Sequence, residues 1–314
     1  MAPIISTAFD GGNGHLLGAT LADGVWEARI NMGTEPFTEG TDKREHHQWF
    51  YFKASNLAGI SQSRFRIVNA GSSSYPAAWP GTWAVASFDR RRWFRTPTTY
   101  DTESGELCVT VEPKGKAFVY VAYFAPFSYE QHLQLVSDCA KSVGLDGTPL
   151  CTVETIATTH QGREVELIRT GDGPLMLWFQ ARQHPGESMA EWWAKGMLER
   201  VLDPTDAASV ELRKLATLHV IPNMNPDGAV MGHLRTNAVG ANLNREWAPT
   251  GDYAAPTRER SPEVLAVLER VTATGCDLFV DVSGKLLCMK SIPTLLPSST
   301  HLCFACPWHA GPRR

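Results

Sequence analysis

An apolar run followed closely by an amphipathic helical pattern constrains the fold of this chain more than any other feature. The run extends from Pro174 to Ala181 and is typical of a buried strand. From Ser188 to Leu202, apolar residues recur at helical spacing. Only residues 182–187 separate the two patterns, so the sequence predicts a tight connection from a strand to a helix.

The connection carries His184 and Glu187, two potential metal ligands three residues apart. Zinc accepts imidazole and carboxylate ligands, and a catalytic zinc site keeps one position open for water. Taken alone, His-x-x-Glu is a weak signal, and a polar turn without metal is the simpler interpretation. The turn is therefore a candidate zinc site whose support has to come from the rest of the chain.

Strands and helices alternate on both sides of this turn. Helices are expected at 130–142, 188–202, 207–216 and 261–274, and strands at 152–158, 165–169, 175–181, 218–222 and 277–282. This order predicts an α/β domain with a mixed, mainly parallel sheet flanked by helices. In such sheets ligands gather beyond the carboxyl ends of the strands. His184, Asn223 and Ser283 each follow a predicted strand, so we expect them to converge.

The first part of the chain has a different pattern. Alternating apolar runs occur at 24–30, 48–54, 63–68, 83–88, 93–95, 107–111 and 117–123, with turn-forming residues between them. They predict an antiparallel β-sandwich domain. Four of its tryptophans are expected to pack in the core and between the sheets, namely Trp26, Trp49, Trp83 and Trp93. With Pro126 as the boundary, we expect domains at 1–126 and 127–282, followed by a tail at 283–314.

Composition and charge exclude several classes of protein. The net charge of −4 argues against a nucleic-acid-binding surface, and there is no apolar run of 18 residues to form a membrane-spanning helix. The segment Met1 to Gly12 lacks the basic and apolar regions of a signal peptide. We therefore expect a cytoplasmic protein with reduced cysteines. Nothing in the sequence indicates an oligomeric state.

A Gly-rich, non-periodic stretch follows the strand expected at 218–222, and it contains Arg235, Asn244 and Arg245. Arginine can bind a carboxylate through two parallel hydrogen bonds, and asparagine adds a neutral donor. An arginine beside a metal can also stabilise a developing oxyanion. The alternative is a solvated loop held by local asparagine turns.

Four ordered motifs in this region resemble those of the zinc carboxypeptidases, specifically the cytosolic carboxypeptidase subfamily. They are His184-Pro185-Gly186-Glu187, Pro222-Asn223-Met224-Asn225-Pro226-Asp227-Gly228, Gly232-His233-Leu234-Arg235-Thr236-Asn237 and Asn242-Leu243-Asn244-Arg245. Segments 9–13, 48–52, 68–75 and 123–129 are similar to the N-terminal β-sandwich of that subfamily. The resemblance covers residues from about 8 to 282.

The resemblance implies a zinc cofactor and hydrolysis of the last peptide bond of a peptide or protein by metal-activated water. His184 and Glu187 would be zinc ligands. Arg235 would polarise the scissile carbonyl and stabilise the oxyanion. Asn244 and Arg245 would hold the C-terminal carboxylate of the substrate.

The chain departs from the family pattern after Val282. Where the family has the third zinc ligand, a histidine in the motif His-Gly-Asp-Glu, this chain has Ser283. A neutral hydroxyl is a poor zinc ligand. The family's general-base glutamate lies further downstream, but residues 283–314 contain no Asp or Glu, although about three would be expected from 33 in 314. We therefore expect an incomplete catalytic domain and an aberrant tail, which a shifted reading frame after about Val282 would explain.

Two alternatives follow from this departure. With two ligands and no identifiable base, the chain would have little or no activity, and it could be a pseudoenzyme that binds peptide C-termini. Alternatively, the tail itself could bind zinc, although its spacing matches no standard zinc finger. The residues of that second site would be His301, Cys303, Cys306 and His309.

Overall fold

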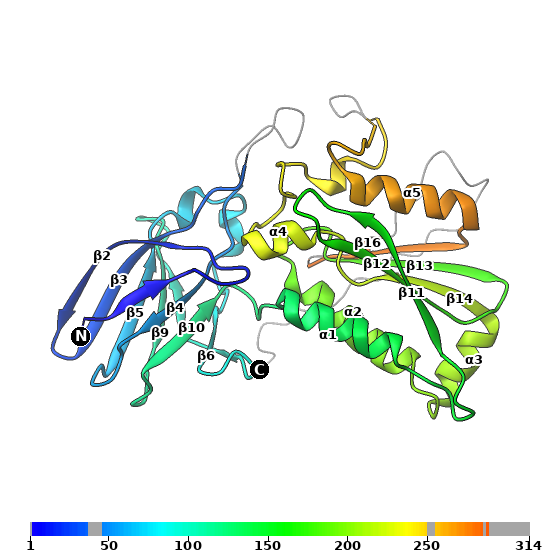
Figure 1. Ribbon diagram of the computed structural model, residues 1–314. Helices are drawn as coiled ribbons and strands as arrows, with labels where there is room; N and C mark the ends of the chain where they lie inside the picture. Colours follow the sequence, from blue (N-terminus) through cyan, green and yellow to red (C-terminus); the bar gives the residue numbers. More distant parts are fainter. Residues whose placement is uncertain (1, 37–45, 250–254, 285–286, 289–314) are drawn as a thin grey trace, which may run out of the picture. The chain divides into compact units, whose positions relative to one another are not determined.

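The structure, a computed structural model, describes residues 2–36, 46–249, 255–284 and 287–288. The chain forms two compact units (Figure 1). The sandwich unit comprises the described residues up to Ser128 together with Gly228–Asn242. The α/β unit comprises Tyr129–Asp227 and the described residues from Leu243 onward. The segment Gly228–Asn242 lies inside the range expected for the second domain but belongs to the first unit, while the boundary near Pro126 stays a prediction.

Two five-stranded sheets make up the sandwich unit. One has the order β1 (Ile4–Ser6), β4 (Tyr51–Ser55), β10 (Phe118–Ala122), β6 (Val85–Ser87) and β7 (Phe94–Arg95). The other has the order β2 (His15–Ala22), β3 (Val25–Asn31), β5 (Gln62–Ile67), β9 (Leu107–Val111) and β8 (Thr98–Tyr100). All pairings are antiparallel except that of β3 with β5. Two short 3-10 helices, η1 (Ala70–Ser72) and η2 (Pro76–Ala78), precede β6.

The two sheets share one core, which confirms the predicted sandwich. Phe52 of the first sheet meets Phe65 of the second with ring centroids 5.1 Å apart. Trp26 and Trp49 are buried as expected. Trp83 is 46% exposed, so its predicted place in the core was wrong. The reason is that β6 begins two residues later, at Val85, so Trp83 precedes the strand although the apolar run in the sequence includes it.

The α/β unit contains a six-stranded sheet. Its order is β11 (Cys151–Thr158), β12 (Glu164–Thr170), β14 (Ala216–Ile221), β13 (Leu175–Ala181), β15 (Leu278–Val282) and β16 (Leu287–Cys288). Only the pairings of β13 with β14 and with β15 are parallel. The sheet is mixed as expected, but the expectation of a mainly parallel sheet was wrong. β11 and β12 form a hairpin, and strands joined by a short turn can pair only in the antiparallel sense.

Helices cover both faces of this sheet (Figure 1). The helices of the unit are α1 (Tyr129–Ala140), α2 (Ser188–Val201), α3 (Ala207–Leu215) and α5 (Pro262–Thr274), with η3 (Leu243–Arg245) as a short 3-10 turn, while α4 (Pro226–Met231) runs across the boundary with the sandwich unit. On one face, Val267 of α5 packs in a cluster with Trp178. On the other face, Ala194 of α2 packs in a cluster with Ala181 and Val280. Trp178 and Ala181 of β13 are an odd number of positions apart, so they face opposite layers, as strand geometry requires.

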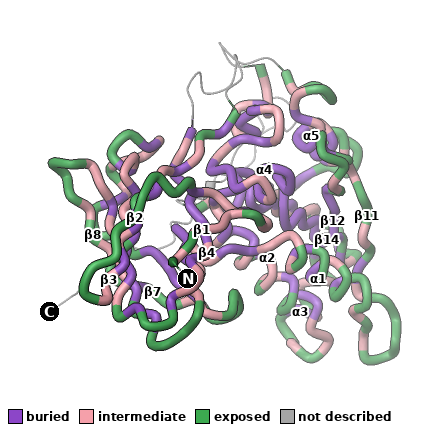
Figure 2. The backbone as a smooth tube through the Cα atoms, turned by 60° about the vertical axis from the view of Figure 1, so that its left-hand side comes forward, coloured by how far each residue is buried: buried purple, intermediate pink, exposed green. Residues whose placement is uncertain are grey.

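Strand β2 was not predicted from the sequence. It is exposed along its whole length (Figure 2). Because neither of its faces is buried, its sequence carries no alternation that a pattern search could detect. Throughout the part of the chain that the structure describes, no helix is long and apolar enough to cross a membrane.

Candidate metal centre

Three neighbouring parallel strands place the predicted residues at one edge of the sheet. Strands β14, β13 and β15 end at Ile221, Ala181 and Val282, and Asn223, His184 and Ser283 lie in the segments that follow these ends. The N–H of Met224 donates to the carbonyl of Ala181 at 3.0 Å. The N–H of Gly284 donates to Glu187 Oε2 at 2.9 Å. The segments that follow the three strands therefore meet, as the strand order predicted.

His184 and Glu187 face each other across a single turn. The N–H of Glu187 donates to the carbonyl of His184 at 3.1 Å, which closes the turn immediately before α2. His184 Nδ1 lies 3.4 Å from Glu187 Oε1. Two ligands that each bind a tetrahedral zinc at about 2.0–2.2 Å are about 3.3–3.5 Å apart. The two side chains thus fit two corners of a zinc site.

A third protein ligand is not supplied by the part of the chain that the structure describes. Within residues 2–36, 46–249, 255–284 and 287–288, no group of three His, Cys, Asp or Glu side chains is placed to hold a metal ion. Ser283 directly follows the end of β15, and the backbone N–H of the next residue, Gly284, contacts Glu187. The proposed tail site and nearly all of the tail lie outside the described residues. The residues of that tail site, as expected from the sequence, are His301, Cys303, Cys306 and His309.

Asn244 and Arg245 lie in η3, in the same unit as His184. Gln183, directly before His184, connects the turn at residues 184–187 to the segment after η3, because its side-chain oxygen accepts a hydrogen bond from Trp247 Nε1. Its amide nitrogen donates to Asp281 Oδ2 on β15 at 2.9 Å. A single glutamine thus links three segments of the α/β unit.

Arg235 belongs to the sandwich unit, unlike the other predicted site residues. Its guanidinium carbon lies 5.5 Å from the centroid of the Tyr75 ring, within the range of a cation–π contact. Its backbone N–H donates to the buried carboxylate of Glu35. The structure therefore groups His184, Glu187, Asn244 and Arg245 in one unit and assigns Arg235 to the other.

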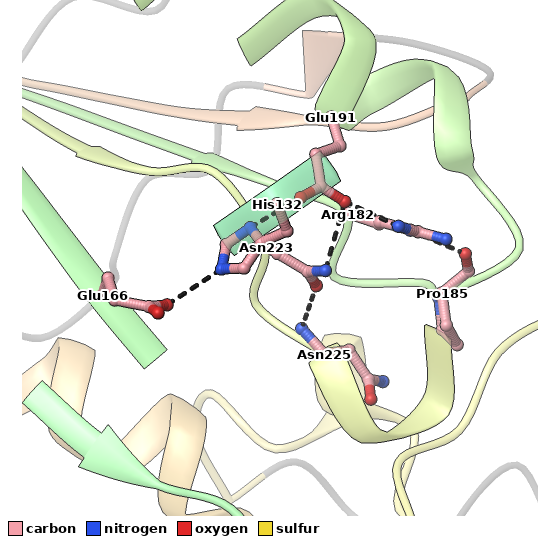
Figure 3. A network of polar contacts seen from close by, with 7 residues as sticks. All are labelled: His132, Glu166, Arg182, Pro185, Glu191, Asn223 and Asn225. Carbon is pink, nitrogen blue, oxygen red and sulfur yellow. Dashed lines mark hydrogen bonds and ion pairs between the residues drawn. The ribbon is translucent and has the colours of Figure 1, made fainter. Parts of the chain in front are cut away.

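A buried ionic network supports the turn at residues 184–187 (Figure 3). Glu191 of α2 accepts hydrogen bonds from His132 Nδ1 at 2.7 Å and Arg182 Nη1 at 2.6 Å. It also accepts one from Asn223 Nδ2 at 3.1 Å. Arg182 Nε donates to the carbonyl of Pro185 at 3.0 Å. Because Pro185 lies between the two candidate ligands, this arginine fixes the backbone that carries them.

His132 is charged within this network. Its burial disfavours the imidazolium, but hydrogen bonds to Glu166 and Glu191 outweigh burial and raise its pKa to about 9. His132 Nε2 lies 2.9 Å from Glu166 Oε2 on β12 (Figure 3). The two carboxylates are thus balanced by His132 and Arg182, as buried charges require.

Sequence reasoning missed Arg182 and Glu191, which hold the turn at residues 184–187, and Glu35, which holds the backbone of Arg235. Glu191 had a detectable signal, since a glutamate on the apolar face of the helix at 188–202 requires a buried partner. Arg182 lies in a polar turn, and its left-handed backbone, with φ of 54°, could not be read from the sequence. Glu35 is nearly 200 residues from its partners, so no local pattern indicated them.

Comparison with known proteins identifies the class of protein that this fold and turn define. Residues 5–124 match the cytosolic carboxypeptidase N-terminal domain, and residues 144–289 match the zinc carboxypeptidase domain. The chain belongs to the zinc carboxypeptidase family, a family of hydrolases, and carries the N-terminal domain of its cytosolic subfamily.

Individual relatives agree with this assignment. A metallo-carboxypeptidase from Pseudomonas aeruginosa, solved in complex with (2-guanidinoethylmercapto)succinic acid, is 40% identical with a TM-score of 0.76, over 89% of this chain and 69% of that one. An uncharacterized protein of Zymomonas mobilis is 40% identical over 89% of this chain and 67% of its own length. Cytosolic carboxypeptidase 1 of Danio rerio is 26% identical, and the match covers 77% of this chain but only 24% of that protein.

Proposed function

We propose that this chain is a zinc-dependent metallocarboxypeptidase that hydrolyses the C-terminal peptide bond of peptides or proteins. The observation that carries this proposal is the 3.4 Å separation of His184 Nδ1 and Glu187 Oε1, which suits two ligands of one zinc ion. Membership of the family adds the reaction type. The proposed compartment is the cytoplasm, and the proposed partner is a free peptide C-terminus rather than nucleic acid or membrane.

The side chains have distinct proposed roles. His184 and Glu187 hold the metal, and the network around Glu191 fixes the turn between them. Bound zinc would supply a Lewis acid and a water of lowered pKa. Arg235 stabilises the oxyanion, and Asn244 and Arg245 bind the substrate carboxylate. A guanidinium suits both tasks because it stays charged and presents several donors in one plane.

The first test is the zinc content of the purified 314-residue chain. We expect about one zinc per chain, lost in His184→Ala and kept in His15→Ala, which alters an exposed histidine of β2. Zinc retained by His184→Ala would show that the metal is bound elsewhere. The absence of zinc from a folded wild-type chain would refute the proposed metal site.

A second candidate function is favoured by Ser283, which directly follows β15, and by the lack of a third ligand in the described part of the chain. This alternative is a catalytically impaired pseudoenzyme that binds peptide C-termini. Binding and turnover of peptides with free and with amidated C-termini are measured to separate the two functions. Binding of only the free form, weakened by Arg245→Ala and without turnover in the presence of zinc, would support the pseudoenzyme. Release of the last residue from the free form would support the enzyme.

A further inference from the structure

A single buried carboxylate holds the backbone around Arg235. Glu35 is 4% exposed and lies after β3, in the same unit as Arg235. Its Oε1 accepts the N–H of Leu234 at 2.6 Å, and its Oε2 accepts the N–H of Thr236 at 2.7 Å. The N–H of Arg235 lies 3.1 Å from both oxygens. The Thr236 hydroxyl donates to Oε2 at 2.8 Å.

Three consecutive N–H groups directed at one anion form a nest, an arrangement that needs a negative charge to be stable. Hydrogen bonds to a carboxylate are shorter and stronger than those between neutral groups, and a buried carboxylate is costly without such donors. Glu35 and the residues 234–236 therefore depend on each other. Because 199–201 residues separate them in the chain, local sequence cannot hold this loop in place.

The loop makes further contacts within the sandwich unit. The N–H of Gly11 donates to the carbonyl of Val230 at 2.8 Å, and Asn13 Nδ2 donates to the carbonyl of Gly232 at 2.9 Å. Gly232 has a φ of 72°, and a Cβ there would lie 2.8 Å from the Gly11 carbonyl oxygen. A side chain at this position would push the loop away from the sandwich.

The guanidinium of Arg235 is also placed by the sandwich unit, over the ring of Tyr75. The backbone of Tyr75 is fixed in turn, because its N–H donates to Gln48 Oε1 at 2.8 Å and its carbonyl accepts from Gln48 Nε2 at 3.3 Å. Both ends of Arg235, the backbone and the charged group, are therefore held by residues that precede it by more than 150 positions.

We propose that Glu35 is a positioning residue for Arg235: its carboxylate sets the backbone at 234–236 so that the guanidinium has one fixed orientation for the reaction. The catalytic part of this inference rests on the proposed function. Within the sandwich unit, Arg235 and the group that orders its backbone thus form one assembly.

The test compares amide hydrogen exchange in the full chain and in Glu35→Gln. Glutamine keeps the size of the side chain but is neutral, and its NH₂ group faces N–H donors. Because Glu35→Gln loses hydrogen bonds to a charged group, we expect amide hydrogen exchange to be at least about tenfold faster than in the wild-type chain. The increase should be confined to peptides covering residues 230–240. The matched control is Glu27→Gln, which removes a carboxylate of β3 paired with Arg66 at 2.8 Å and leaves the loop untouched.

A milder variant keeps the proposal testable if Glu35→Gln does not fold. Thr236→Val removes only the hydroxyl donor, and we expect a smaller, several-fold increase in exchange over the same peptides. Unchanged exchange at 230–240 in folded Glu35→Gln would overturn the proposal, as would an equal increase throughout the unit.

Peptide hydrolysis supplies the second readout. We expect Glu35→Gln to lower kcat with less than about a threefold change in KM, because the positioned group acts in the transition state. Combining it with Arg235→Ala should add no further loss, since both changes act through one group. A large effect of Arg235→Ala with none from Glu35→Gln would overturn the positioning role. No effect of Arg235→Ala, or no turnover by the wild-type chain, would instead refute the proposed function, and faster exchange would still show that Glu35 orders the loop.

Discussion

Raising the pH from about 6 to about 9 is expected to destabilise the α/β unit through His132. The imidazole lies between Glu166 and Glu191, and although burial opposes its charge, these two partners raise its pKa to about 9 from 6.5. A raised pKa means that the folded state holds the proton more tightly than the unfolded state. The stabilisation is therefore complete below about pH 6.5 and lost as the pH rises through about 9.

The magnitude follows from the size of the shift. Each pKa unit corresponds to about 1.4 kcal/mol, so a change from 6.5 to about 9 is worth about 3 kcal/mol. The assay is urea unfolding at several pH values, followed by circular dichroism at a helix-sensitive wavelength. The four longer helices, α1, α2, α3 and α5, all belong to the α/β unit, so this probe reports on the unit that contains His132.

Two matched variants test the cause. Glu166→Gln removes one of the two carboxylates beside His132. We expect this change to reduce the pH-dependent decrease in the free energy of unfolding by about half and to shift the decrease to lower pH. Glu164→Gln changes an exposed carboxylate on the same strand and should keep the full loss. The reasoning would be refuted if Glu166→Gln kept the full pH-dependent decrease in stability. It would also be refuted if the wild-type chain showed no such decrease.

Four further predictions concern His219, Asp206, Gly171 and Gly196. Burial lowers the pKa of His219 to about 4, so stability should fall by about 3 kcal/mol between about pH 6.5 and pH 4, and His219→Phe should remove this loss in urea titrations. Asp206→Ala should cost about 1 kcal/mol in the same assay, because the Asp206 side chain caps α3 by accepting a backbone N–H at 3.0 Å. Gly171→Ala should cost at least about 2 kcal/mol, since φ is 81° and a Cβ would lie 2.2 Å from the Ala216 carbonyl oxygen. Gly196→Ala, at an exposed helical position with open space around it, should instead raise the melting temperature.

Much of the architecture was predictable because burial leaves a periodic trace in the sequence. Strand β13 occupies the predicted residues 175–181, and α2 lies within one residue of its predicted range. Each of these elements buries one face or more, so its apolar residues recur at the period of its backbone. Strand β2 and the exposed Trp83 carry no such trace.

The candidate site was predictable to a smaller extent. The convergence of the segments after β13, β14 and β15 followed from strand order alone. The roles of His184, Glu187, Arg235, Asn244 and Arg245 came from the family resemblance and stay predictions. The polar groups that hold these segments, such as Glu35 and Arg182, are set by three-dimensional proximity between distant residues, and no spacing rule in one sequence reveals such pairs.

The order of the two units along the chain affects how the protein is synthesised. The chain leaves the sandwich unit after Ser128, returns to it at Gly228 and leaves again after Asn242. The buried Glu35 therefore has no partners until the ribosome has extended the chain past Thr236, by which time strands β11 to β14 have already been made. The N-terminal unit cannot mature first, as most domains do during translation. A chain released before residue 236 would leave the Glu35 carboxylate without these backbone donors, and the sandwich unit would be less stable as a result.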